Sequence, residues 1–189
     1  MDYFSAYAAL PINGAQIGLE WGSDKPSFCT PVGAEIFATN NGIQFCLVPE
    51  YGEMVFAVDG DACGDALVFP LAQSFADFLR LILACGNTAA IEQIQWWTRE
   101  TFDQYLATGG WEPDCDLAPS PEELAAEKAS TQAVLDTIAQ ALDLTPMPDP
   151  FDYVKALQAT FDDSKLVFSH DYYDCLGLED PNDPDTPCD

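Results

Sequence analysis

The Asn41-Gly42 pair constrains the fold of this chain more than any other feature of its sequence. It lies between two β-rich runs in the stretch VGAEIFATNNGIQFCLV, residues 32–48. Asn-Gly is the preferred centre of a two-residue hairpin turn, because both residues tolerate a positive φ. We therefore predict an antiparallel hairpin in which Asn40 opposes Ile43.

The register of this hairpin follows from the same turn. Ala38 is expected opposite Phe45, and Ile36 opposite Leu47. One face of the hairpin then carries only apolar side chains or small ones: Ile36, Ala38, Ile43, Phe45 and Leu47. The other face carries Glu35, Phe37, Gln44 and Cys46. A slip by one residue would exchange the two faces, so burial of the apolar face should fix the register.

The residues after the hairpin predict more strands and then helices. EMVFAV (53–58) should form a third strand, and ALVFPLA (66–72) a short fourth strand or edge segment stopped by Pro70. Residues 15–21 and 165–168 are further strand candidates. Ser74 is a good helix N-cap, with Asp77 placed as in a capping box and Gly86 at the expected end. Helices are also expected over 88–97, around 102–106, over 120–144 and from 149 onward.

These elements predict an α+β fold, in which helices cover an antiparallel β-meander sheet and a helical extension follows. We expect the α+β domain to span residues 1–110, including the stretch 1–31, which shows no clear opening helix. A helical extension packed on this domain should span 111–170, and a flexible acidic tail 171–189.

The charge of the chain restricts its partners. Thirty-two Asp and Glu face only six Lys and Arg, which gives a formal net charge of -26. Nucleic acid and anionic membranes are disfavoured, because the chain lacks the cations that neutralise phosphate. No apolar run is long enough to predict a membrane span. A basic protein partner fits this charge, although solubility alone would also explain it.

The sequence contains no convincing catalytic or metal motif. The loop VDGDACGD (58–65) resembles a calcium loop, but Cys63 and Pro70 stand where oxygen ligands are required. The seven cysteines form no Cys-x-x-Cys pair, and His170 is the only histidine. Ser169-His170-Asp171 are consecutive, so their side chains cannot converge as a catalytic triad. We expect no cofactor and no metal, and reduced thiols in a cytoplasmic, non-enzymatic protein.

Two groups of residues, together with the Tyr172-Tyr173 pair, suggest protein binding. Acidic side chains cluster on the loops that bound the third strand, and one tryptophan of the Trp96-Trp97 pair is expected to be partly exposed near further acids. Simple solvation and burial of both tryptophans are the alternatives. The candidate partner-binding residues are Glu50, Glu53, Asp59, Asp61, Asp65, Trp96 and Glu100.

The order of these signals resembles the SUKH superfamily, the Smi/Knr-type proteins. The phrase that carries the resemblance is Pro70-Leu71-Ala72 followed by Ser74-Phe75-Ala76-Asp77-Phe78-Leu79, and the likeness spans roughly residues 32–86. Leu10-Pro11 and Trp21 also resemble family features, but the opening helix of the family is not evident. The resemblance implies a mixed sheet and a protein-binding role. Many family members are bacterial immunity proteins that neutralise toxins, often nucleases, and others are adaptors.

Three functions therefore remain open. The first is an immunity protein that occludes a basic, nuclease-type toxin. The second is an intracellular adaptor or regulatory domain of the same fold, and the third is an enzyme with an unrecognised metal or thiol site. The sequence does not predict the oligomeric state.

Overall fold

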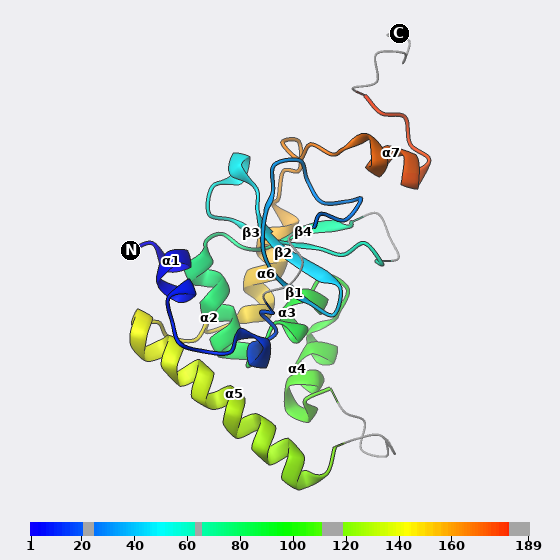
Figure 1. Ribbon diagram of the computed structural model, residues 1–189. Coiled ribbons are helices and arrows are strands. Elements are labelled where there is room, and N and C mark those ends of the chain that lie inside the picture. The colour runs from blue at the N-terminus through cyan, green and yellow to red at the C-terminus, as the bar shows by residue number, and fades with distance from the viewer. Residues whose placement is uncertain (21–24, 63–65, 111–118, 182–189) are drawn as a thin grey trace.

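The fold is α+β, as the sequence predicts. A computed structural model describes residues 1–20, 25–62, 66–110 and 119–181 (Figure 1). Its centre is an antiparallel sheet of β1 (Glu35–Asn40), β2 (Ile43–Leu47), β3 (Val55–Val58) and β4 (Val68–Ala72), in that spatial order. The sheet is a simple meander, so β1 and β4 are its two edges.

The Asn41-Gly42 turn forms where it was predicted. Both residues have positive φ, 48° and 89°, and Asn40 opposes Ile43 while Ala38 opposes Phe45. The register then shifts at a bulge between Ile36 and Ala38, which leaves Ile36 opposite Cys46. The predicted pairing of Ile36 with Leu47 is therefore wrong.

The bulge also places Ile36 and Phe37 on the faces of the sheet opposite to those predicted. Phe37 joins Ala38 and Phe45 in the main core, where its ring contacts Phe75, whereas Ile36 packs on the opposite side. A strict alternation cannot predict this, because one extra residue in a strand reverses the alternation beyond it.

Both faces of the sheet are buried. Helices cover one face and form the main core with side chains such as Phe45, Ala57 and Phe69. The other face carries Cys46, Phe56 and Val58 and lies under less regular chain. That cover includes Phe28, Ala34, Tyr51, Met54, Phe161, Leu166 and Tyr172.

The helices begin at the residues that favour N-caps. Besides the 3-10 turns η1 (Gly14–Ile17) and η2 (Pro49–Tyr51), the α-helices are α1 (Tyr3–Ala8), α2 (Phe75–Cys85), α3 (Ala89–Gln93), α4 (Arg99–Thr108), α5 (Pro121–Leu142), α6 (Pro150–Ala159) and α7 (His170–Leu176). The Ser74 hydroxyl accepts from the Asp77 N–H at the start of α2. Ser120 and Glu123 form a complete capping box at α5.

Several local predictions differ from the structure. Within residues 15–20 the chain forms the end of η1 and a single bridge from Glu20 to Thr39 instead of a strand. Residues 165–168 form no strand, and the helix expected over 88–97 ends at Gln93. Pro70 lies inside β4 rather than ending it. An opening helix, α1, is present with Asp2 as its N-cap.

The C-terminal helices pack on the sheet domain. Ile138 of α5 and Val154 of α6 belong to the same buried cluster as Phe45 of β2. Figure 1 shows α5 lying along α1 and α2, while α7 projects from the body of the molecule. The predicted tail, 171–189, therefore begins within a helix, and residues 182–189 lie outside the described part of the chain. The described helices include none that is long and apolar enough to cross a membrane.

Candidate binding groove

The acidic residues predicted to bind a partner do not form one cluster. Glu50 and Glu53 lie between β2 and β3, whereas Asp59 and Asp61 follow β3. Because β3 runs from one end of the sheet to the other, these two loops lie at opposite ends. The four described acids thus lie on the two loops that bound β3, as predicted, but they form two separate groups; their role in binding stays a prediction, and Asp65 lies outside the described residues.

The tryptophan pair divides as expected. Trp97 packs on the main core and against Tyr105, with 4.9 Å between ring centroids. Trp96 is 42% exposed, and its ring meets Phe69 of β4 edge to face at 5.2 Å. Glu100 is exposed in the first turn of α4. Trp96 thus lies beside an edge strand of the sheet.

A groove of about 300 Å³ runs along β4, on the side away from β3. It is bounded by β4, by α6 and by the chain between α6 and α7. Its lining residues are Ala66, Leu67, Val68, Phe69, Pro70, Gln95, Gln158, Phe161, Asp163, Leu166, Phe168 and Tyr172. The volume lies at the small end of the range of ligand sites.

The backbone of β4 presents hydrogen-bonding groups to this groove. The Asp59 N–H donates to the Leu67 carbonyl at 2.8 Å, which makes Val58 and Val68 a non-hydrogen-bonded pair. The N–H and C=O of Val68 therefore point away from β3. Pro70 has no N–H, and its carbonyl accepts from Gln158 Nε2 at 3.3 Å. A proline within a strand is tolerated at an edge, so Pro70 was a signal in the sequence for this position.

Aromatic side chains form the far wall of the groove. Phe168 and Tyr172 stack with centroids 4.0 Å apart and ring planes within 13°. A backbone hydrogen bond from Val32 N–H to the Val167 carbonyl, at 2.7 Å, joins this wall to the chain that precedes β1. Tyr172 belongs to the Tyr172-Tyr173 pair that suggests binding in the sequence, but the wall itself was not predicted, because 165–168 was assigned to a strand and 171–189 to a flexible tail.

Acidic residues lie along the groove. Asp163 lines it, and the Asp59 turn adjoins its Leu67 end. The Asp59 carboxylate accepts from the Asp61 N–H at 3.0 Å, as in an Asx turn. The described lining contains no Lys or Arg. Within the described ranges, no group of three or more His, Cys, Asp or Glu is arranged to hold a metal ion.

Glu92 is a buried acid on α3. Its side chain accepts from Asn40 Nδ2 at 3.1 and 3.3 Å, at the tip of the hairpin. The residue is 3% exposed. Burial raises the pKa of Glu92 to about 7; the Asn40 hydrogen bond opposes the rise, and the nearby charge of Asp59 adds to it.

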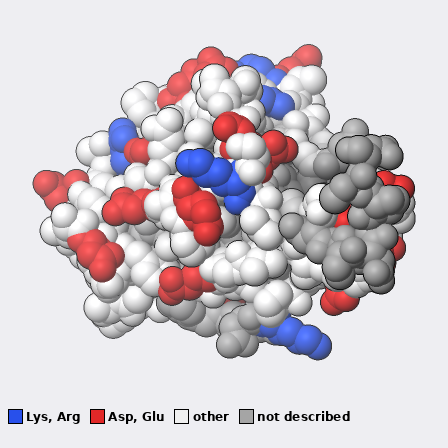
Figure 2. Space-filling model, turned by 90° about the horizontal axis from the view of Figure 1, so that it is seen from above, with Lys and Arg blue, Asp and Glu red and all other residues white. Residues whose placement is uncertain are grey.

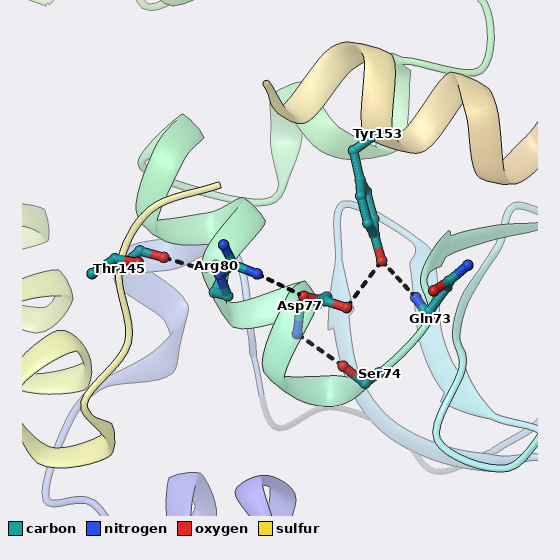
Figure 3. A network of polar contacts seen from close by, with 6 residues as sticks. All are labelled: Gln73, Ser74, Asp77, Arg80, Thr145 and Tyr153. Carbon is teal, nitrogen blue, oxygen red and sulfur yellow. Dashed lines mark hydrogen bonds and ion pairs between the residues drawn. The ribbon is translucent and has the colours of Figure 1, made fainter. Parts of the chain in front are cut away.

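A second polar network joins α2 to α6 (Figure 3). The Tyr153 hydroxyl donates to Asp77 Oδ2 at 3.2 Å and accepts from the Gln73 N–H at 3.0 Å. Asp77 also pairs with Arg80 Nη1 at 3.1 Å. Because Asp77 holds these partners, its carboxylate serves tertiary packing instead of closing the capping box expected at Ser74. Burial raises the pKa of Tyr153 to about 12.

His170 and the described cysteines show no catalytic arrangement. The ring nitrogens of His170 lie 3.3 Å from Asp174 and 3.1 Å from Asp180, on the exposed helix α7. Ser169 is the N-cap residue of that helix. Cys29 and Cys46 are buried under the sheet, and burial raises the pKa of the Cys46 thiol to about 12. Such a thiol is a poor nucleophile at neutral pH.

Comparison of the chain with protein-family models, with curated proteins and with solved structures finds no match.

Proposed function

We propose that this chain is a non-enzymatic, acidic protein-binding domain whose partner is a basic protein. The observation that carries the proposal is the use of its few cations. Arg99 pairs with Asp149 and Asp152 at 2.7 and 2.8 Å, and Arg80 pairs with Asp77. These arginines are engaged within the molecule, so they contribute little positive potential outside it.

Two lysines are also engaged within the fold. Lys155 donates to the Gln95 carbonyl at 3.0 Å, and Lys165 lies 5.8 Å from the centroid of the Tyr51 ring. On the face in Figure 2, acidic side chains spread over the surface, and the basic groups near the centre of the view lie beside acidic ones. A net charge of -26 then gives a negative field that would attract a basic partner and speed its encounter.

The SUKH resemblance gives the proposal its concrete form, an immunity protein that occludes a basic, nuclease-type toxin in the cytoplasm. The opening helix α1, the β-meander and helix α2 follow one another along the chain in the order that the resemblance implies. The described sheet is purely antiparallel, however, whereas the family has a mixed sheet. The alternative is an adaptor of the same fold with no toxin partner.

The test is a calorimetric titration of the full chain with a basic nuclease-type toxin domain encoded beside its gene, at 50 and 500 mM NaCl. We expect binding to weaken at least about tenfold at the higher salt, because screening removes the long-range attraction. A noncognate basic protein of similar charge is the control. No complex, or a complex indifferent to salt, would refute the proposal. Binding that leaves the nuclease active would favour the adaptor.

A further inference from the structure

The edge of β4 can accept another strand at Val68, the one residue of β4 that is not buried. Val68 directs its N–H and C=O away from β3, into the groove, as the Asp59–Leu67 hydrogen bond requires. Unpaired groups at a sheet edge are a template for strand addition. Pro70 and Gln158 limit that template at the other end, because Pro70 has no N–H and its carbonyl is taken. Pairing is thus confined to a short segment around Val68.

The walls of the groove suit the side chains of an added strand. Successive side chains of a strand point to opposite faces of a sheet. On the face of the sheet that the helices cover, the side chains of an added strand would meet Gln95, next to the exposed Trp96. On the other face they would meet the stacked rings of Phe168 and Tyr172. Apolar side chains could therefore be anchored on either side of the β4 plane.

The charge around the groove selects the kind of strand. Asp163 lies in the lining and the Asp59 turn adjoins it; the described lining has no cation, and the Lys155 ammonium next to it donates to the Gln95 carbonyl. A second copy of this chain would bring another charge of -26. The chain's own residues 182–189 contain three Asp and no Lys or Arg. Both occupants are disfavoured by repulsion, whereas a basic segment is attracted.

We infer that the β4 groove binds an extended segment of alternating basic and apolar residues, which joins the sheet beside β4. This inference rests on the protein-binding function proposed above and names the surface that serves it. Main-chain hydrogen bonds to Val68 supply part of the affinity, and the aromatic wall and Asp163 supply the preference for apolar and basic side chains.

The first experiment uses the full ¹⁵N-labelled chain and the peptide acetyl-Val-Lys-Val-Lys-Val-Lys-amide. Because strand addition depends mainly on backbone pairing, a generic alternating peptide is a fair probe. We expect amide shifts to change at Val68, Phe69 and Gln158. The same peptide N-methylated at every residue keeps its charge but has no residue N–H left to donate to the sheet edge, and its methyl groups crowd that edge, so its binding should be weaker by at least about fivefold. Equal binding of the two peptides would overturn the inference.

The second experiment compares two variants that each remove one negative charge. Asp163→Asn alters the groove, whereas Asp136→Asn alters an exposed position on α5, which packs against α1, α2 and η1. We expect the peptide to bind Asp163→Asn about threefold more weakly than Asp136→Asn, since nearby charges act more strongly than distant ones. Equal losses in the two variants would mean that only total charge matters, and would overturn the inference.

The outcomes separate this inference from the function that it rests on. If the basic toxin domain binds with the expected salt dependence but peptide shifts fall outside β4, the groove is not the site and the proposed function stands. If the peptide does not bind at millimolar concentration in low salt, the groove assignment is wrong. If the peptide binds at β4 but the toxin domain does not bind, the groove assignment holds and the immunity function fails.

Discussion

Glu92 is the residue whose environment differs most from that of an exposed acid. Its carboxylate is buried between α3 and the hairpin tip, with Asn40 as its hydrogen-bonding partner, and Asp59 and Tyr105 are the titratable groups near it. Its pKa is raised to about 7 in the folded chain, from an ordinary value of 4.5. The folded state therefore retains a proton that the unfolded state loses, and the stability of the chain falls as pH rises between these two values.

Glu92→Gln should remove this dependence, because the amide does not titrate and can still accept from Asn40. We compare the free energy of unfolding of the variant with that of the wild type at each pH. This difference should shift in favour of the variant by on the order of 3 kcal/mol between pH 4.5 and pH 8. Urea denaturation at several pH values measures the difference. Glu127→Gln, at an exposed position of α5, is the control and should gain little. A Glu92→Gln difference that stays constant with pH would contradict the assignment.

Single residues also show where sequence reasoning succeeds and where it fails. Asn41 and Gly42 encode their turn locally through their tolerance of positive φ, so the hairpin could be predicted. The bulge at Phe37 has no local signal. It places one more aromatic ring against Phe75 and Phe78, and such a gain depends on partners remote in sequence.

At the scale of elements, caps were more informative than strand propensity. Ser74, Ser120 and Asp149 each cap the helix predicted to follow them. KLVF (165–168) has strong β-propensity but forms no strand, and it is held by the hydrogen bonds from Val32 N–H to the Val167 carbonyl and from Lys165 N–H to the Tyr51 hydroxyl. Strand propensity is realised only where a neighbouring strand is present. The β4 groove could not be predicted for the same reason, since its far wall is this segment.

The Tyr153 hydroxyl adds a polar contact to the packing of α6 against α2. Tyr153→Phe removes the donor to Asp77 and the acceptor for the Gln73 N–H. We expect a loss of about 0.5–1.5 kcal/mol in the free energy of unfolding, the net contribution of a typical hydrogen bond, because the Gln73 N–H is exposed and water can replace the hydroxyl. Chemical denaturation measures it. The matched control is Tyr173→Phe, which deletes a hydroxyl on α7 while keeping the ring contact with Tyr172. Equal losses in both variants would show that the network does not fasten α6 to α2.

At the scale of the whole molecule, charge acts on folding as well as on binding. Six Lys and Arg cannot compensate 32 acids, so most pairwise interactions between charges are repulsive in the folded chain. Compact folding brings these acids closer together and costs free energy. Salt also weakens attractive pairs such as Arg99–Asp149. Because such pairs are few, the stability lost when they are screened should be smaller than the stability gained when repulsion between the acids is screened.

Sodium chloride should therefore stabilise the fold while it weakens partner binding. The melting temperature should rise by roughly 2–8 °C, which corresponds to about 1–2 kcal/mol for a chain of this size. Most of the rise should occur below about 0.2 M, where the Debye length falls from about 30 Å to below 8 Å. Calorimetry across this range measures it, with sucrose, which strengthens burial without screening charge, as the control. A flat or falling melting temperature would mean that local ion pairs, and not net repulsion, dominate the electrostatics of the folded chain. The negative field invoked for partner binding would then be weaker than the formal charge implies.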